Sequence, residues 1–375
     1  MKPVSEVELT EAVAGAEGPL RIVGGGTRPV GRAVEGETLS VAGIAGVVDY
    51  EPGALTLVAK AGTPVEEVER VLAAEGQRLA FEPMDHRGLL GTEGTPTIGG
   101  VVAANVSGPR RVQAGACRDF LLGVRFVDGM GRVLKNGGRV MKNVTGYDLV
   151  KLMAGSRGTL GVLTEVSFKV LPKPEAEATL IVHGPAGGEA VALMAEALGS
   201  PYDVTGAAHF PLTAGDGADT MIRLEGFAAS VAYRVERLKV QFAGRAEMNV
   251  VEGEASGRAW AGVRDVSVLH EAAGDVWRVS VKPSDAGAVL ARLPEGALRC
   301  LDWGGGLIWV ACNAGHDLRG DLAGIGGHAT LVRASEAVKA GLGVFQPEPA
   351  PIQKISQGLR DRFDPRAILN PGLIG

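Results

Sequence analysis

The sequence predicts a protein of the α+β class with two domains. Its 375 residues exceed the length that one hydrophobic core usually serves. Short strand-like and helix-like segments alternate as far as Pro172 and Pro174, which mark a boundary. Beyond these prolines the order β-α-β-β-α-β can be read twice in succession. We therefore expect one domain over residues 1–173, a second over residues 174–333, and a C-terminal segment, 334–375, that packs back on the first domain.

The elements of the first domain follow from apolar periodicity and turn residues. In chain order we expect a helix at 4–14, strands at 20–23, 38–41, 47–50 and 55–60, a helix from 63 to 76, a small-residue helix at 98–105, a hairpin of strands 120–127 and 132–135, a helix at 148–153 and a strand at 160–171. The second of these helices has the clearest start. Thr63-Pro64-Val65-Glu66 offers an N-cap hydroxyl, a proline at the first helical position and a capping-box carboxylate, and Gly76 ends the helix.

The repeated order in the second domain predicts an α/β domain built from two βαββαβ units. The first unit is expected at 178–183, 189–198, 204–210, 220–225, 230–242 and 246–251. The second unit is expected at 275–281, 285–293, 297–301, 307–312, 317–323 and 328–332. In the tail, an expected helix carries four apolar residues on one face: Ile352, Ile355, Leu359 and Phe363.

The composition is that of a globular protein and excludes several classes. Hydrophobic residues make up 46% and charged residues 22%, which are ordinary values. A net charge of −5 gives no basic face for nucleic acid. Three scattered cysteines, Cys117, Cys300 and Cys312, do not suit an iron–sulfur cluster, a cysteine-rich zinc site or a disulfide framework. Neither a secretory signal nor an apolar run of about 18 residues is present, so we expect a cytoplasmic protein that reaches the inner membrane only through partners.

Glycine is the outlier of the composition, and its 56 residues gather in clusters between apolar runs. The first cluster, Val23-Gly24-Gly25-Gly26-Thr27, follows a strand directly. Bare amides there can close on phosphate oxygens as an anion-binding nest, although glycine runs also form ordinary turns. Arg28-Pro29 stands where a Rossmann helix would begin, and Arg32-Ala33 stands where a Walker motif requires Lys and Ser/Thr. Both of those nucleotide motifs are therefore disfavoured.

Two further clusters combine glycine with hydroxyl and cationic side chains. Residues 97–105, followed by Ser107 and by Arg110-Arg111, place small residues at a helix start whose positive end suits a diphosphate. The alternative is a closely packed small-residue helix with both arginines on the surface. Residues 155–162 lead into a strand and are preceded by a motif at 142–149.

In this order the blocks resemble the FAD-binding domain of the vanillyl-alcohol oxidase / p-cresol methylhydroxylase (PCMH) superfamily. More narrowly, they are similar to the family of FAD-binding E subunits of bacterial glycolate oxidase. The resemblance is densest over residues 21–172 and resumes at 326–331 and 370–372. It implies a two-subdomain PCMH-type FAD-binding domain followed by an α/β cap domain.

The same resemblance implies which residues contact FAD. They are Gly24, Gly25, Gly26 and Thr27 as the pyrophosphate loop; Thr97, Gly99, Gly100, Ala103 and Ser107 along the diphosphate and isoalloxazine; Arg118 with Asp119 at the start of the next strand; and Gly158, Leu160, Gly161 and Val162 at the adenosine end. Some relatives attach FAD covalently through a histidine just after the first glycine loop, where Thr27 and Arg28 stand in this chain. Binding should therefore be noncovalent, and Cys117 is interpreted as a packing residue rather than a thioether link.

Catalytic residues are less evident than cofactor contacts. The motifs H-G-D-G-N and E-H-G-I-G of the catalytic D-2-hydroxy-acid dehydrogenases do not occur in the sequence, and the six histidines lack metal-ligand spacing, so no metal is expected. His316 and His328 lie in glycine-rich surroundings and are the candidates for a base, although a structural role is commoner for such histidines. Residues 302–306 also match the glycolate oxidase subunit family, and can equally form a tight hairpin anchored by a tryptophan.

The resemblance thus implies an electron-transferring FAD subunit of a glycolate oxidase complex that oxidises a small 2-hydroxy acid. Its catalytic flavoprotein subunit and its iron–sulfur subunit would be separate chains. The first alternative is a self-sufficient FAD-dependent dehydrogenase for D-lactate or a similar acid. The second alternative is a non-redox scaffold that kept the fold and lost the cofactor.

Overall fold

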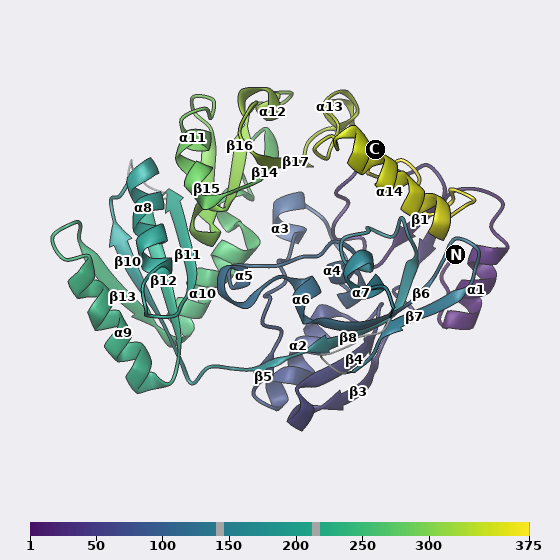
Figure 1. Ribbon diagram of the computed structural model, residues 1–375, viewed down its shortest axis with the longest axis horizontal. Coiled ribbons are helices and arrows are strands. Elements are labelled where there is room, and N and C mark those ends of the chain that lie inside the picture. Colours follow the sequence, from purple (N-terminus) through teal and green to yellow (C-terminus); the bar gives the residue numbers. More distant parts are fainter. Residues whose placement is uncertain (140–145, 212–217, 375) are drawn as a thin grey trace.

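The computed structural model describes residues 1–139, 146–211 and 218–374 (Figure 1). A five-stranded sheet with small flanking sheets forms the lower right of that view, and an eight-stranded sheet forms its left and top. The C-terminal helix, drawn in yellow, lies over the first part of the chain. The motif expected at 142–149 falls partly outside the described residues, since 142–145 are among those left out.

The first part of the chain contains short helices around an antiparallel sheet. Its helices are α1 (Glu6–Ala14), η1 (Pro52–Ala54), α2 (Val65–Ala74), α3 (Arg87–Leu90), α4 (Ile98–Ala103), α5 (Arg111–Ala114), α6 (Cys117–Phe120) and α7 (Leu149–Met153). Its strands are β1 (Leu20–Val23), β2 (Glu37–Ser40), β3 (Val47–Glu51), β4 (Thr56–Lys60), β5 (Gln77–Arg78), β6 (Leu121–Val127), β7 (Val133–Gly137), β8 (Val162–Lys169) and β9 (Leu171–Pro172). The large sheet has the order β3-β4-β8-β6-β7, and β1 and β2 pair in parallel beside it. The expected hairpin is confirmed as β6 and β7.

Buried apolar residues hold α2 and α4 against the large sheet. Leu57, Phe126 and Phe168 are fully buried in one cluster with Val68 of α2 and Ile98 of α4. The capping box expected before α2 is wrong. The Thr63 hydroxyl donates to a backbone carbonyl instead of capping the helix, and it also accepts a hydrogen bond from the Gly46 amide at 2.9 Å. The threonine therefore ties two loops together, and Pro64 takes the cap position.

The later part of the chain builds the cap. Its helices are α8 (Gly187–Leu198), α9 (Ala228–Gln241), α10 (Gly253–Asp265), η2 (Ser267–Leu269), η3 (Pro283–Asp285), α11 (Ala286–Leu290), η4 (Trp303–Gly305) and α12 (Leu318–Asp321), followed by α13 (Glu336–Leu342) and α14 (Ala350–Phe363) in the tail. Its strands are β10 (Ala176–His183), β11 (Val204–Pro211), β12 (Ala218–Gly226), β13 (Met248–Glu252), β14 (Asp275–Val281), β15 (Leu298–Asp302), β16 (Leu307–Cys312) and β17 (Gly327–Arg333).

The strand order confirms the internal duplication. The eight strands lie in the order β13-β10-β12-β11-β15-β16-β14-β17. Counted from its outer edge, each half of the sheet contains its own strands in the order fourth, first, third, second. This is the strand order of a βαββαβ unit. The halves join where His209 of β11 pairs with Leu301 of β15.

Helix α10, between the two units, was not expected from the sequence. Its apolar periodicity is weak, because small and charged residues fill most of the segment. Only Ser256, Trp260 and Val263 are buried along its length. Three residues at this spacing suffice to fix a helix on a sheet, but they are too few for a clear pattern.

The second half of the cap sheet has one face under helices and one face toward the first part of the chain. Because side chains alternate along a strand, Trp277 and Val279 of β14 enter the core beneath the helices. Arg278 and Ser280 point to the other side, where they line a cavity. The pairing places Arg278 beside Trp309 of β16.

Buried ion pairs join the first half of the cap to the first part of the chain. Arg223 of β12 donates to both carboxylate oxygens of Glu82, at 3.0 and 2.9 Å. Arg110 donates to both oxygens of Glu225, at 2.7 and 2.6 Å, and also pairs with Glu82. Arg78 adds a further contact to Glu225 at 2.6 Å. Burial raises the pKa of Glu225, but its arginine neighbours outweigh that effect and leave it well below its usual range.

The chain returns to its beginning after α14. Leu369 bridges to Leu20 of β1, and the Asn370 side chain accepts a hydrogen bond from the Ile22 amide at 2.7 Å. Ile352 and Ile355, two of the four residues expected on the packed face of α14, are 48% and 62% exposed. Contact with the first part of the chain therefore comes from the end of the helix and the residues that follow.

Candidate flavin site

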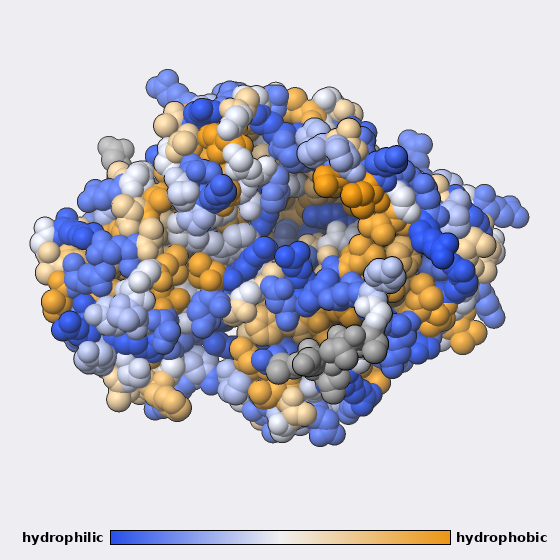
Figure 2. Space-filling model, in the orientation of Figure 1, coloured by the Kyte–Doolittle hydropathy of each residue, from blue (hydrophilic) through white to orange (hydrophobic). Residues whose placement is uncertain are grey.

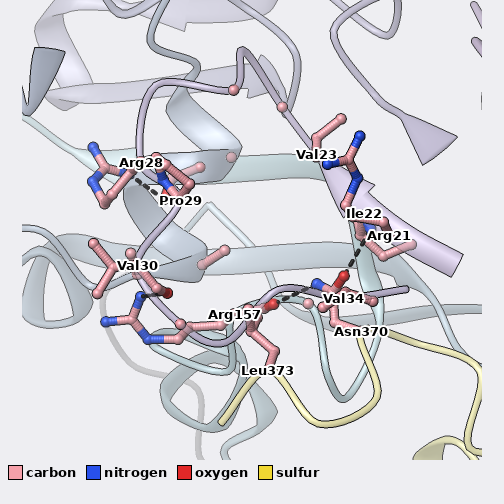
Figure 3. A pocket seen from close by; sticks show the side chains of 18 of the residues that line it. Arg21, Ile22, Val23, Arg28, Pro29, Val30, Val34, Arg157, Asn370 and Leu373 are labelled. Carbon is pink, nitrogen blue, oxygen red and sulfur yellow. Dashed lines mark hydrogen bonds between the residues drawn. The ribbon is translucent and has the colours of Figure 1, made fainter. Parts of the chain in front are cut away.

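The three glycine clusters meet around one cavity of about 560 Å³ (Figure 3). The predicted residues in its wall are Gly24, Gly25, Gly26, Thr27, Thr97, Gly99, Gly100, Ala103, Gly158, Gly161 and Val162. The tail completes the wall with Asn370 and Leu373, and the Asn370 side-chain Nδ2 donates to the Arg157 carbonyl at 2.9 Å. Segments that are far apart in the sequence thus share one hollow, as a common ligand would require.

The first glycine loop has the open amides of an anion-binding nest. Among the described residues, no hydrogen-bond acceptor is found for the backbone amides of residues 24–27. Gly26 has φ +72°, and a Cβ there would meet no atom within 4 Å. These amides are therefore available to phosphate oxygens.

Gly25 has a different reason to be glycine. A Cβ at this position would lie 1.7 Å from the Thr95 carbonyl oxygen. A side chain at Gly25 would therefore displace the protein's own backbone before it could obstruct a ligand.

The second glycine cluster contributes shape rather than free amides. The Ile98 amide donates to the Thr63 carbonyl at 2.9 Å, and the Gly99 amide donates to the Ala61 carbonyl at 2.8 Å. The Thr97 hydroxyl caps α4 by accepting from the Gly100 amide at 3.3 Å. The backbone N–H groups of residues 98–100 are therefore already engaged in hydrogen bonds within the protein.

Two half-buried arginines without carboxylate partners among the described residues supply the charge that an anion needs. Arg28 donates to His86 Nδ1 and to the Gly100 carbonyl, both at 3.0 Å. Arg157 lies 4.7 Å over the Phe345 ring and donates to the Val30 carbonyl at 3.4 Å. Burial lowers the pKa of each arginine to about 10. No salt bridge to either forms within residues 1–139, 146–211 and 218–374.

Arg28 and Arg157 are residues of this cavity that the sequence did not single out as FAD contacts. Arg28 entered only as an argument against other motifs, and Arg157 as part of a glycine cluster. The available signal was a cation placed inside each of two glycine clusters. A nearby negative ligand is the usual complement of such a group.

A second cavity of about 1090 Å³ adjoins the first. Both walls include Arg28, Val30, Arg32, Ala104 and Arg157. The second cavity lies between the tail and the inward face of the cap, and Figure 2 shows a hollow near the centre of this side of the molecule.

The remaining predicted residues are divided between this second cavity and the surrounding structure. Ser107 and His328 line the second cavity, and burial lowers the pKa of His328, as do Arg278 and Arg111. His316 instead contacts Asp321, with Nε2 2.6 Å from the carboxylate. In the part of the chain that the structure describes, His316 belongs to neither cavity wall.

Arg118, Asp119 and Leu160 likewise lie outside both walls as far as the described residues go. Asp119 accepts a hydrogen bond from the Ala116 amide at 2.8 Å, and the Arg118 amide donates to the Asn105 side chain at 3.0 Å. These contacts fix the start of α6 behind the cavity wall. Leu160 is buried in the core.

The three cysteines lie among buried apolar residues. Cys117, Cys300 and Cys312 are buried free thiols, and burial raises the pKa of the Cys117 thiol. Over the described ranges, no group of three or more His, Cys, Asp or Glu side chains could hold a metal ion. Within those ranges, too, none of the helices has the length and apolarity to cross a bilayer.

Comparisons with known proteins agree with the geometry. A family model described as FAD binding domain matches residues 1–137. The glycolate oxidase subunit GlcE of Escherichia coli (strain K12) is 38% identical over 357 residues, which cover 94% of this chain and 92% of that protein. The glycolate oxidase subunit GlcD of Bacillus subtilis (strain 168) is 33% identical over 135 residues, covering 36% of this chain and 27% of its own.

A solved structure shows the same fold at low sequence identity. An alkyldihydroxyacetonephosphate synthase superimposes with a TM-score of 0.69 at 18% identity, covering 99% of this chain and 76% of the synthase. The PCMH-type arrangement expected from the sequence is therefore confirmed. With its FAD-binding domain and its match to GlcE along nearly the whole length, the chain belongs to the GlcE family of glycolate oxidase subunits, which are FAD-dependent oxidoreductases.

Proposed function

We propose that FAD lies across the two adjoining cavities, with its diphosphate against the first glycine loop. The observation that carries this proposal is the convergence of open amides at residues 24–27 with the half-buried cations Arg28 and Arg157. When bound, FAD supplies a reversible acceptor of two electrons. The chain binds the cofactor, excludes water from it and holds positive charge beside it.

We further propose that the chain works as the electron-transferring FAD subunit of a glycolate oxidase complex. The match to GlcE supports this role, and the GlcD match is consistent with a separate related flavoprotein subunit. Its partners would be that catalytic flavoprotein subunit and an iron–sulfur subunit. The three buried free thiols suit a cytoplasmic location, with attachment to the inner membrane through those partners.

Purification of the chain alone tests cofactor binding. We expect flavin absorbance in the purified protein, and FAD should reassociate after removal. Treatment with denaturant should release all of the flavin into the filtrate, because no thioether is expected at the buried Cys117 thiol. Flavin that stays with the denatured protein would disprove the noncovalent mode.

A self-sufficient dehydrogenase is the second candidate function. His328, a candidate base, and the arginines of the second cavity favour it. Anaerobic mixing of the FAD-loaded chain with glycolate or D-lactate separates the two roles. We expect no bleaching by the lone chain and rapid bleaching when co-purified partner subunits are added. Bleaching by the lone chain would favour the dehydrogenase. Absence of FAD binding would favour the non-redox scaffold.

A further inference from the structure

The second cavity has a positive wall, although the chain carries a net charge of −5. The described residues of the wall include seven arginines: Arg28, Arg32, Arg111, Arg157, Arg264, Arg278 and Arg360. They include two carboxylates, Asp302 and Glu348. An anion is the natural complement of this imbalance.

Arg278 and Arg111 form a pair that lies outside the glycine-lined first cavity. They line the second cavity and not the first. Their guanidinium carbons lie 5.3 and 4.6 Å from the centre of the Trp303 ring. Among the described residues neither makes a salt bridge or a side-chain hydrogen bond. Both guanidinium groups therefore contact the same indole ring and line the second cavity, and their N–H donors have no acceptor among the described residues.

Trp303 is held firmly enough to position both cations. Its ring nitrogen donates to the Gly108 carbonyl at 3.0 Å, and its amide donates to Asp302 at 2.7 Å. The residues 303–305 all have positive φ, at 53°, 65° and 97°, so the chain makes a tight turn there. The segment 302–306 is therefore the tryptophan-anchored turn considered in the sequence, and it also forms part of the cavity.

Polar groups beside Arg278 can recognise a second oxygen of a ligand. Strand pairing places Thr330 opposite Arg278, and His328 opposite Ser280. All four residues line the cavity, as does Asp302. Burial raises the pKa of Asp302 to about 7, so this carboxyl can donate or accept a proton near neutrality.

We propose that Arg278 and Arg111 bind the carboxylate of a small 2-hydroxy acid in the second cavity, with Ser280, Thr330 and Asp302 beside its hydroxyl. Guanidinium groups suit this role because their planar donors match a carboxylate. The choice of a 2-hydroxy acid rests on the second proposed function, in which this chain itself takes the substrate, whereas the anion site rests on the geometry alone.

Calorimetric titration of the FAD-loaded chain tests the site, with sodium glycolate, sodium acetate and sodium phosphate as probes. Acetate lacks the hydroxyl, and phosphate reports general anion binding. We expect glycolate to bind about tenfold more tightly than either, since an unused hydroxyl site penalises acetate. In Arg278→Gln glycolate affinity should fall by about tenfold or more.

The matched control is Arg299→Gln, which removes an exposed arginine on the other face of the same half-sheet. Glycolate affinity should be unchanged in this variant. Flavin absorbance of each variant reports FAD retention separately, so loss of the flavin site is distinguishable from loss of the carboxylate site. If Arg278→Gln does not retain FAD, Arg111→Gln carries the test, because Arg111 is on a different element.

Three results would overturn the proposal. They are absence of glycolate binding by the wild-type chain, unchanged glycolate affinity in the arginine variants, and equal affinity for all three probes. If the wild-type chain fails to take up FAD, the proposed function fails. Titration of the flavin-free chain then still decides whether Arg278 binds a carboxylate.

Discussion

The two halves of the cap sheet each carry an arginine on the face toward the first part of the chain, and they use it differently. Arg223 of the first half lies 4.3 Å over the Trp260 ring and donates to both oxygens of Glu82. Arg278 of the second half also lies against tryptophan, but no carboxylate pairs with it among the described residues. Burial lowers its pKa to about 10, and the nearby Arg111 and Arg157 add to that effect.

The comparison shows what distinguishes a structural buried charge from a binding one. Desolvation of an arginine is costly, and a carboxylate partner within the protein offsets that cost permanently. Arg223 has such a partner on another part of the chain, so it fixes the cap in place. Arg278 has none among the described residues, and the proposed carboxylate ligand would supply one.

The largest expected effect comes from replacing the two arginines by methionine, one at a time. Arg223→Met leaves Glu82 short of a partner and should lower the free energy of unfolding by about 3–5 kcal/mol. Arg278→Met removes an unpaired charge and should change it by less than about 1 kcal/mol. Urea unfolding followed by circular dichroism measures both. An equal loss of stability in the two variants would remove the distinction.

The next effect concerns the first cavity, whose wall is rich in glycine backbone, in contrast to the arginine-lined second cavity. A Cβ at Gly100 has only Thr97 and Arg28 atoms within 4 Å, so Gly100→Val should fold and intrude on the first cavity. FAD affinity should then fall by about tenfold or more, as measured by flavin fluorescence titration.

Gly25→Val is the matched comparison, because its side chain would collide with the Thr95 carbonyl. This variant should lose stability as well as FAD affinity. Full FAD affinity in a folded Gly100→Val protein would place the cofactor elsewhere.

The smallest effect is the pH dependence of stability, which has opposite signs for one residue in each half of the cap sheet. Burial lowers the pKa of His209, on β11, to about 4. Between pH 6.5 and 4 the unfolded chain therefore binds a proton that the folded chain does not, and stability falls as the pH falls. Burial raises the pKa of Asp302, on β15, to about 7, so stability rises as the pH falls from 7 toward 4.

Unfolding at pH 7 and at pH 5 measures these opposite slopes, each at most about 1.4 kcal/mol per pH unit. His209→Gln should make the chain more resistant to acid than the wild type. Asp302→Asn should make it less resistant. A shift in the same direction for both variants would contradict the assigned signs.

Local sequence patterns predicted most of the elements and the convergence of the glycine clusters. The duplication was visible because each unit repeats the same order of apolar strands and helices. Helix α10 was missed because its contact with the sheet depends on a few residues such as Trp260. The capping box failed because Thr63 found stronger partners in neighbouring loops, which the local sequence does not show.

The residues of the candidate site also differ in how far the sequence could identify them. The glycine clusters can be recognised from the sequence alone, although the close contact that requires glycine at position 25, with the Thr95 carbonyl, cannot. Arg278 cannot be recognised either, because nothing near it in sequence indicates that it will lie half-buried beside Trp303 without a carboxylate partner among the described residues. Its proposed role depends on the lack of a carboxylate partner on neighbouring strands among the described residues, and only the tertiary structure shows this.

The return of the tail to β1 has a consequence for biosynthesis. The wall of the flavin cavity includes Asn370 and Leu373, and Asn370 bonds to backbone atoms beside two of the glycine clusters. A nascent chain emerging from the ribosome therefore presents the glycine loops long before the hollow between them is closed. Stable capture of FAD in this cavity should therefore wait until residues 370–373 have been translated and have packed against the glycine loops.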